Sequence, residues 1–456
     1  MKPKNLIYTY VSMASHYDTS WGRGTPDEGV DRTAHTAHKH GIPVTWIVNS
    51  GSIAVLGDRI RKWHDEYGDD VIMRCPNFAR DAGKDKTKML ALLEAEWRAL
   101  QEAFPWAMTK VAGSGIADGD AIAILEEAGF EGMWGYCWEQ VWWDGLTNQG
   151  IPWGFWYVDG KRFKAPHPGR GSLVACEWTA RDLHSSYHTA SPVVYSTDPN
   201  DVLRAGLCTG DNIDYWKRLF DDYLRNTDAN DQVFFLQHQE AHEMEVTERF
   251  AVYPFSHVEA CDAMQDLFFQ YIRQFPVTVT TLPAAIRAYR ERNAETAPVY
   301  MLTSDSAIRP ELNDYSMTLG GVGLGPWPDT LFYYDKECQL AFVRGENKPR
   351  MMRNYVGKWS MQEEFGEPVP PVFVTHYEKG TDRIEIVYEI GYWRPMPFGL
   401  AYWDDLTGFA VEDAGPETIE AKIVEDQVAL FRFNLTGGPR RIPVTLRRTN
   451  NGEVRA

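Results

Sequence analysis

The sequence predicts an α/β protein: a distorted (β/α) barrel of seven or eight strand–helix units at residues 1–296, followed by a C-terminal antiparallel β-sandwich at residues 297–456. Two observations predict it. Short apolar runs alternate with helical segments up to about residue 290, which is the pattern of a parallel sheet and the length of a barrel domain. From about residue 297, alternating apolar and polar runs between Gly, Pro and Asn indicate antiparallel strands.

The strands are predicted from these short apolar runs. In the barrel they fall at residues 5–13, 42–49, 69–75, 109–115, 130–136, 172–178, 232–238 and 276–282. In the second domain they lie within residues 330–345, 370–380, 382–391, 427–438 and 440–452.

Helices are predicted between the barrel strands, at residues 31–41, 88–104, 119–129, 256–275 and 283–292. The second of them has one apolar face, formed by Met89, Leu90, Leu93, Trp97 and Leu100. Gly41 suits the left-handed residue that follows a helix. Ser256 and Glu259 have the spacing of a capping box. In the first helix, His35, His38 and His40 are interpreted as part of a solvated face rather than a ligand cluster.

The composition favours some partners and excludes others. The chain of 456 residues has a formal net charge of −18 and no basic stripe, which argues against nucleic acid and anionic membranes. The 17 Trp and 22 Tyr favour contact with sugar rings, with a large Trp-containing core as the alternative. The six cysteines are widely spaced without a CxxC motif, which indicates buried, reduced thiols.

The first apolar run, at residues 5–14, is interpreted as a strand because it is short and lacks a signal-peptide pattern. We therefore expect a cytoplasmic chain, or a secreted or periplasmic one if a leader has been removed. The expected partner is a carbohydrate or polar small-molecule substrate, with no nucleic acid and no membrane. The sequence leaves the oligomeric state open.

Polar side chains recur where the predicted strands end, which is the edge where barrel enzymes place their chemistry. The candidate substrate-binding residues at this edge are Trp21, Asn49, Gly113, Ser114, Trp138 and Glu139. The candidate catalytic residues are Asp18, Glu177, Asp182, His238 and Glu240. We expect these residues to form one wall of an active site.

The histidines after the late strand suggest acid–base or metal chemistry. His238 and His242 are four residues apart, with Glu240 between them, and could meet on one helical turn. The spacing is similar to H-x-x-x-H but lacks the Glu of a zincin helix, so metal binding and general acid–base catalysis both stay open. For Asp18, a role as a turn residue is the alternative to catalysis.

Glu177 and Asp182 form a carboxylate pair that is close in the sequence. Two carboxylates at one rim suit glycoside hydrolysis, in which one protonates the leaving group and the other attacks or activates water. The alternative for Asp182 is that it caps a helix beginning near Leu183.

The first domain resembles the polysaccharide deacetylase (NodB-like) family of the glycoside hydrolase/deacetylase superfamily. Four stretches carry the likeness: HGIPVTWIVNSGSI (40–53), GSGIADGDAIAILEEAGFEGMWGY (113–136), VFFLQHQ (233–239) and FPVTVTTLPAAIRAY (275–289). The resemblance covers about residues 4–290 and rests on order and spacing. It implies a seven-stranded barrel that hydrolyses N- or O-acyl groups on a sugar, with His238 as the acid histidine.

The sequence departs from the family in its metal motifs. Family members usually open with Thr-Phe-Asp-Asp, and here HYDTSW offers only Asp18 at that place. The two metal histidines of the family would fall within RCPNFARDAG (74–83), which contains no histidine. One divalent metal (Zn, Ni, Co or Mn) would therefore be held differently, for instance by Asp18 with His16, His238 or His242. A metal-independent enzyme is the alternative.

Three functional hypotheses stay open. The first is an acyl hydrolase in which Asp18 is the base or metal ligand, His238 is the acid, and backbone N–H groups at residues 113–115 hold the oxyanion. The second is a glycoside hydrolase in which Glu177 pairs with Asp18, Asp182 or Glu240. The third is a non-catalytic sugar-binding protein on the same barrel.

Overall fold

The computed structural model describes residues 5–19, 22–113, 119–135, 154–158, 167, 170–182, 196–227, 230–247, 250, 253–296, 299–302, 331–335, 340–344, 372–390, 396–424, 426, 428–436 and 440–449. The chain divides into two compact units. The first comprises residues 1–297, 306–325 and 364–366, and the second comprises residues 298–305, 326–363 and 367–456.

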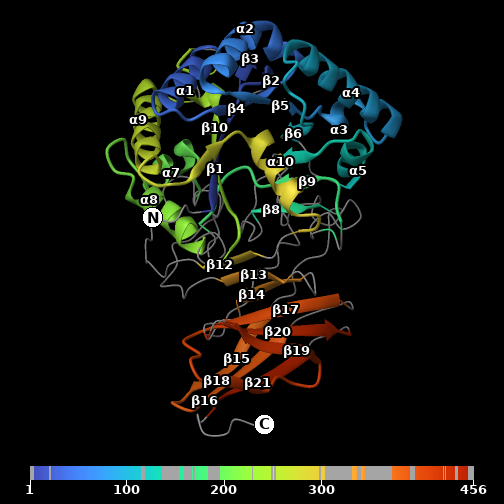
Figure 1. The fold of residues 1–456 in the computed structure, drawn as a ribbon, viewed down its shortest axis with the longest axis vertical. Helices are drawn as coiled ribbons and strands as arrows, with labels where there is room; N and C mark the ends of the chain where they lie inside the picture. Colours follow the sequence, from blue (N-terminus) through green and yellow to red (C-terminus); the bar gives the residue numbers. More distant parts are fainter. Residues whose placement is uncertain are drawn as a thin grey trace. The chain divides into compact units, whose positions relative to one another are not determined.

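A nine-stranded sheet organises the first unit. Its strands are β1 (Leu6–Met13), β4 (Val44–Val48), β5 (Asp70–Arg74), β6 (Val111–Gly113), β7 (Gly132–Trp134), β8 (Phe155–Tyr157), β9 (Val174–Cys176), β10 (Val233–Glu240) and β11 (Thr278–Thr280). They follow the order β10-β1-β4-β5-β6-β7-β9-β8, with β11 paired to β1 (Figure 1). The β8–β9 pair is antiparallel and the other pairs are parallel, which confirms the predicted α/β class.

The sheet is curled, so the two ends of this strand path meet through side chains. Phe155 of β8 stacks on Phe234 of β10, with ring centroids 3.9 Å apart. Tyr289 packs edge-on against both rings. Closure by aromatic packing gives the distorted barrel that the sequence predicts.

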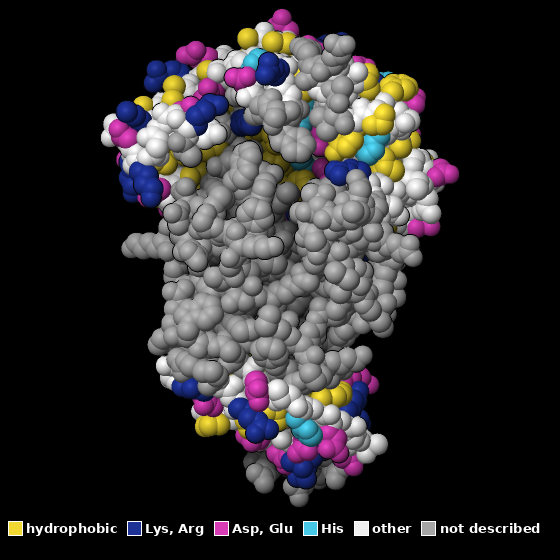
Figure 2. Space-filling view, turned by 180° about the vertical axis from the view of Figure 1, so that it is seen from behind, with side chains coloured by type: hydrophobic (Ala, Val, Ile, Leu, Met, Phe, Trp, Pro, Cys, Tyr) yellow, Lys and Arg dark blue, Asp and Glu magenta, His cyan; other side chains and the backbone are white. Residues whose placement is uncertain are grey.

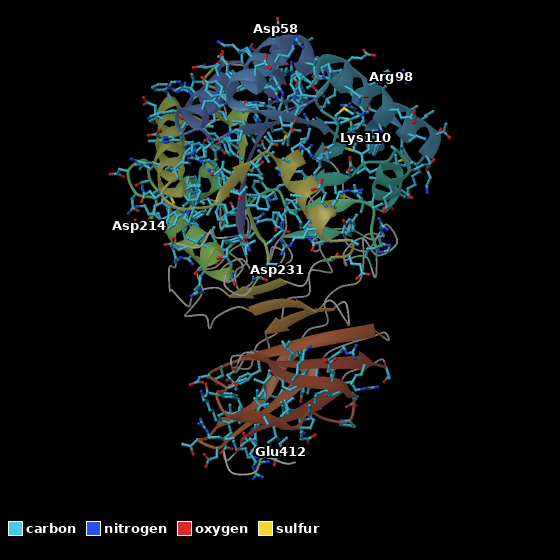
Figure 3. The ribbon with its side chains drawn as sticks, in the orientation of Figure 1. Asp58, Arg98, Lys110, Asp214, Asp231 and Glu412 are labelled. Atoms are coloured by element: carbon cyan, nitrogen blue, oxygen red, sulfur yellow. The ribbon has the colours of Figure 1, made fainter. Side chains whose placement is uncertain are left out.

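Helices cover the outer face of the curled sheet (Figure 1). They are α1 (Glu28–Lys39), α2 (Ser50–Tyr67), α3 (Phe78–Asp81), α4 (Lys86–Ala103), α5 (Gly119–Glu127), α7 (Pro199–Arg204), α8 (Asp214–Asn226), α9 (Phe255–Ile272) and α10 (Leu282–Arg292). Each long helix buries one side and exposes the other, because apolar residues recur at helical spacing. In α2, Leu56 and Ile60 are buried, whereas Asp58 points to solvent (Figure 3).

Helix α2 is absent from the predicted elements. Asn49 begins it, because the Asn49 side chain accepts a hydrogen bond from Ser52 N while Ser52 Oγ accepts one from Asn49 N. Gly68 ends it in the left-handed conformation, with φ of 79°. The prediction for α9 also needs correction. The helix starts at Phe255, after Pro254, and does not use the predicted Ser256–Glu259 capping box.

The interpretation of the α1 histidines as a solvated face is wrong for two of them. His38 Nε2 lies 2.9 Å from Asp69 Oδ1, and the His38 side chain is 6% exposed. His40 Nε2 lies 2.7 Å from Asp266 Oδ1. His35 is exposed, as expected. Both buried imidazoles therefore bind carboxylates that fasten α1 to its neighbours.

The second unit contains two sheets. One has the order β12-β13-β14-β17-β20-β19 and the other β15-β16-β21-β18. The strands are β12 (Val299–Leu302), β13 (Leu331–Asp335), β14 (Leu340–Arg344), β15 (Val372–Lys379), β16 (Arg383–Ile390), β17 (Met396–Trp403), β18 (Phe409–Asp413), β19 (Thr418–Val424), β20 (Val428–Leu435) and β21 (Arg440–Arg448). The pairing is antiparallel except between β14 and β17, which run parallel.

Acidic and basic side chains are interspersed on the described surface that Figure 2 shows. This distribution matches the mixed charge of the sequence. Among the described helices, none is long and apolar enough to cross a bilayer. The four described cysteines, Cys75, Cys176, Cys208 and Cys261, are buried.

Candidate functional site

The carboxyl end of β10 carries the centre of the candidate site. β10 pairs with β1 so that His238 lies opposite Val11. Side chains alternate along a strand, and Leu236 belongs to the buried interior cluster of the barrel. His238 and Glu240 therefore point to the same interior side as Leu236. This end of the sheet is the edge at which the sequence predicts the chemistry.

His238 is held in an aromatic frame. Its ring centroid lies 4.9 Å from that of Trp134 and 4.9 Å from that of Trp178. The side chain is 1% exposed, and its Nδ1 lies 3.5 Å from Asp198 Oδ2. Neither ring nitrogen of His238 has a hydrogen-bond partner among the described residues, so the Asp198 carboxylate faces Nδ1 at 3.5 Å without a hydrogen bond. One ring nitrogen thus faces a carboxylate, and the other is buried with its hydrogen-bonding capacity unused.

Asp198 is the functional candidate that sequence reasoning missed. It begins α7, and its Oδ1 accepts hydrogen bonds from the backbone N–H groups of Asn200 (2.9 Å) and Asp201 (3.1 Å). These bonds fix the carboxylate, so that Oδ2 is presented to His238. An Asp followed by Pro is typical of the start of a helix, so the sequence indicates the cap of α7. Nothing in the sequence indicates that Asp198 also faces His238 of β10.

A second group of polar side chains follows β10 on the short helix η2 (Ala241–Met244). His242 Nε2 lies 3.2 Å from Glu240 Oε2. Glu240, His242 and Glu243 each offer one ligand atom, and these atoms all lie within 4.8 Å of one another. Tyr17 packs beside this trio, with its ring centroid 4.6 Å from that of His242. The Arg74 guanidinium carbon lies 4.7 Å from the Tyr17 ring centroid.

A network of hydrogen bonds among side chains of α7 and α9 holds Glu243 in place. Asn200 of α7 donates a hydrogen bond from its side chain to Glu243 Oε2. The Asn200 Oδ1 atom lies 2.9 Å from His257 Nε2 and accepts a 3.4 Å hydrogen bond from Cys261 Sγ. Residues of α7 therefore contact both groups, because Asp198 faces His238 and Asn200 binds Glu243.

Helix α1 fixes the position of η2. A Cβ atom at Gly29 would lie 1.8 Å from Ala241 O, a distance that only glycine permits. The backbone N–H of Glu28 donates a 3.1 Å hydrogen bond to Glu245 Oε1. The close approach of the two segments sets where His242 and Glu243 lie.

Burial shifts the proton affinities of both imidazoles. It lowers the pKa of His238, although Asp198 acts in the opposite direction. Burial, together with the charge of Arg74 and the neighbouring imidazole of His238, lowers the pKa of His242 to about 3. Both rings are therefore neutral at pH 7 in the protein as described.

The carboxylates at the site repel one another. Burial raises the pKa of Glu243 well above its ordinary value, and the charges of Glu240, Asp198 and Asp201 raise it too. Burial also raises the pKa of Tyr17 well above its ordinary value, with Glu240 adding to the effect. The Tyr17 phenol is thus protonated at neutral pH.

Several buried polar atoms at this edge have no hydrogen-bond partner among the described residues. They are Tyr17 Oη, Trp178 Nε1, both ring nitrogens of His238, and His242 Nδ1. Buried polar groups are normally satisfied, and a cluster of exceptions calls for an explanation. Their grouping around His238 and the trio indicates a place where a polar ligand is received.

Glu177 and Asp182 are both held by arginines. Arg181 Nε lies 3.0 Å from Glu177 Oε1, and both side chains are almost fully buried. Arg218 Nη2 lies 2.5 Å from Asp182 Oδ2. The Arg181 guanidinium also lies over the Trp178 ring at 5.0 Å, so this pair supports one wall of the His238 frame.

Asp18, His16 and Asn49 lie away from His238. Asp18 is exposed on the hairpin of β2 (Tyr17–Thr19) and β3 (Gly22–Gly24), where alternation turns it to the side opposite Tyr17. His16 is exposed, and its Nδ1 lies 3.1 Å from Thr25 Oγ1. The Asn49 side chain hydrogen-bonds the backbone of His16 and caps α2.

The other predicted substrate-binding positions divide into two groups. Gly113 ends β6, and its carbonyl accepts a 2.9 Å hydrogen bond from Cys75 N. A Cβ there would lie 3.0 Å from Ile72 Cδ1, so the position has little space for a side chain. The remaining predicted positions lie outside the described residues: Trp21, Ser114, Trp138 and Glu139.

The metal ligands predicted from the sequence in place of the family's own do not come together among the described residues. Asp18 and His16 are exposed on the hairpin side, whereas His238 and His242 are buried at the interior mouth. Within the described part of the chain, no group of three ligand atoms within 4.8 Å includes Asp18, His16 or His238. His242 instead groups with Glu240 and Glu243.

No protein-family model and no curated protein matches the sequence. Solved structures give low-identity likenesses. A protein provisionally assigned as a glycoside hydrolase/deacetylase from Parabacteroides distasonis is 13% identical with a TM-score of 0.47, over 75% of this chain and 84% of that one. A probable polysaccharide deacetylase from Pseudomonas aeruginosa PAO1 is 12% identical with a TM-score of 0.41, over 64% and 93%. Puue allantoinase is 13% identical with a TM-score of 0.40, over 64% and 93%. At this identity the likeness concerns the fold.

Proposed function

We propose that this protein is a hydrolase that cleaves an N- or O-acyl bond on a sugar or a related polar small molecule. One observation carries the proposal: His238 has a carboxylate behind one ring nitrogen and an unused, buried nitrogen on the other side. This arrangement is the one that general acid–base catalysis requires, because the carboxylate orients the ring and the second nitrogen exchanges protons with the substrate.

The roles follow from the contacts. Asp198 orients His238 through Nδ1. His238 Nε2 takes a proton from the attacking water as its oxygen bonds to the acyl carbon. The same nitrogen then gives that proton to the leaving nitrogen or oxygen as the acyl bond breaks. We assign to the Tyr17 hydroxyl, which is protonated and has no hydrogen-bond partner among the described residues, the hydrogen bond to the acyl oxygen.

A sugar is the favoured substrate because of a polar group in the aromatic walls. Trp134 and Trp178 flank His238, and the indole N–H of Trp178 has no partner among the described residues. Both rings are almost fully buried, so the unused indole N–H of Trp178, and not an open ring face, is the feature that favours a substrate with hydroxyl groups. The sequence predicts Asp18 as the base, and that role stays a prediction. The contacts of the described residues favour His238 for this proton transfer.

The geometry favours acyl hydrolysis over the predicted glycosidase pair. The carboxylates of Glu177 and Asp182 are each bound to a largely buried arginine, which commits them to the structure of the barrel. A glycosidase needs one carboxyl group that stays protonated and faces the leaving group.

The test is a substrate screen with three readouts. The purified chain is incubated with N-acetylated and O-acetylated sugars, and acetate, reducing ends and ligand binding are measured on the same samples. Acetate release supports the proposal. New reducing ends without acetate would instead establish the glycosidase alternative. Saturable binding with neither product would establish the sugar-binding alternative.

A further inference from the structure

We propose that Glu240, His242 and Glu243 bind one divalent transition-metal ion of the Zn²⁺ type. The proposal goes beyond the proposed function and does not depend on it. It also differs from the ligand set predicted from the sequence, since it uses neither Asp18 nor His16.

The ligand atoms are already at coordination spacing. All three lie within 4.8 Å of one another, and His242 Nε2 is 3.2 Å from Glu240 Oε2. Two ligand atoms that are each about 2.1 Å from a tetrahedral Zn²⁺ lie about 3.4 Å apart. The chain reaches this spacing because β10 ends at Glu240 and η2 turns at once, so that His242 and Glu243 come back beside the strand end.

The trio carries more negative than positive charge. Glu240 and Glu243 bring two carboxylates to His242, and a described cation beside them, Arg74, lies over the Tyr17 ring at 4.7 Å. His242 is 2% exposed, and Asn200 orients the Glu243 carboxylate by a hydrogen bond. Carboxylates that crowd at a partly buried edge repel one another, and a bound cation removes that repulsion.

A separate observation points to a ligand at the trio. Tyr17 is 6% exposed, and its ring centroid lies 4.6 Å from that of His242. Its hydroxyl has no hydrogen-bond partner among the described residues. A phenol buried against the trio with an unused hydroxyl is satisfied when a metal-bound water or a ligand oxygen lies there.

The donor set selects the class of ion. One imidazole with two carboxylates suits Zn²⁺ and its neighbours better than Mg²⁺ or Ca²⁺, which prefer oxygen ligands alone. Three protein ligands leave a fourth position for water, as in zinc sites that keep one open coordination position.

The second unit supplies a matched control. His376, Glu378 and Glu385 also lie within 4.8 Å of one another, but His376 and Glu378 are exposed. Arg383 Nη2 already lies 2.9 Å from Glu385 Oε1 and supplies a positive charge there. We therefore expect no tight ion at this exposed trio.

The experiment measures metal binding without any substrate. The full chain is stripped with a chelator and titrated with Zn²⁺ by calorimetry, and the bound metal is counted by elemental mass spectrometry after desalting. We expect one ion per chain. His242→Gln and Glu243→Gln should each weaken binding about tenfold or more, whereas His376→Gln should leave it unchanged. Mn²⁺ is titrated in parallel to compare a harder cation.

Two results would overturn the proposal: a wild-type chain that retains no ion, or equal binding by the wild type and both trio variants. Thermal unfolding of each variant identifies one that fails to fold, and Glu240→Gln then takes its place. Failure here is distinguishable from failure of the proposed function. A chain that binds Zn²⁺ but releases no acetate contradicts only the function, and a chain that releases acetate without metal contradicts only the metal site.

Discussion

At the residue scale, the candidate site depends on pairs whose partners are distant in the sequence. His238 was predictable because it ends an apolar strand, but Asp198 was not, since its nearest signal is that of a helix cap. The sequence did not indicate Tyr17, because its neighbours His16 and Asp18 are of residue types more typical of catalysis. Alternation along the strand nevertheless turns Tyr17 inward and Asp18 outward.

Asp198→Asn tests whether this carboxylate positions His238. Asn is also a good helix cap, so α7 should persist while the charge facing Nδ1 is lost. We expect kcat for acetate release to fall about 10²-fold or more, with KM and the melting temperature little changed. Steady-state kinetics and thermal unfolding measure both. A variant that loses stability but keeps kcat would assign Asp198 to structure alone.

Glu177→Ala separates the two hydrolase hypotheses. Removing one partner of the buried Glu177–Arg181 pair should lower the free energy of unfolding by about 3–5 kcal/mol. Denaturant titration measures that loss, and activity is expressed per folded molecule. Because the pair supports the Trp178 wall but does not take part in proton transfer, we expect the rate of acetate release per folded molecule to fall much less than in His238→Gln. Complete loss of turnover at unchanged stability would point to Glu177 as a catalytic carboxylate.

At the scale of elements, the regular strands and amphipathic helices followed from apolar spacing, whereas α2 did not. Its buried positions include Ser52, Gly57 and Ile60, so its inner face carries a weak apolar signal. The site depends on a similar detail that no periodicity reveals. Gly29 of α1 allows Ala241 of η2 to approach, and this contact is visible only in three dimensions.

Gly29→Ala tests this contact. The new methyl group would meet Ala241 O at 1.8 Å, so α1 and η2 must separate and the trio must shift. We expect Zn²⁺ affinity and acetate release both to fall about tenfold or more. Gly210→Ala is the matched control, because a Cβ there meets its nearest atom at 3.4 Å, an ordinary contact. Equal behaviour of the two variants would show that the α1–η2 approach does not position the trio.

At the scale of the whole molecule, the order of elements predicted a parallel sheet and an antiparallel second region. The strand pairing confirms both, apart from the antiparallel β8–β9 pair and the parallel β14–β17 pair. The strand order and the closure of the barrel could not be predicted, because they depend on contacts such as Phe155 with Phe234.

The stability of the fold depends in part on groups remote from the site. Asp70 begins β5, and burial raises the pKa of its carboxyl, although hydrogen bonds from Val71 N and Thr281 Oγ1 act in the opposite direction.

Asp70→Asn should therefore alter the pH dependence of folding. Because the folded-state pKa of Asp70 is raised, the folded chain binds more protons than the unfolded chain between the two pKa values. The free energy of unfolding contributed by this group falls as pH rises through that window. We expect Asp70→Asn to be more stable than the wild type at pH 7, with the difference shrinking as pH falls toward 4. Urea titrations at several pH values measure it, and a pH-independent difference would contradict the explanation.

The central claim is that His238, oriented by Asp198, performs the proton transfers of an acyl hydrolase. The most direct measurement compares kcat/KM for acetate release among the wild type, His238→Gln and His38→Gln. His38 is the matched control, because it is also a buried histidine beside an aspartate but is part of α1. We predict a loss of about 10²–10⁴-fold for His238→Gln and near wild-type turnover for His38→Gln. Wild-type turnover by a folded His238→Gln variant would contradict the account.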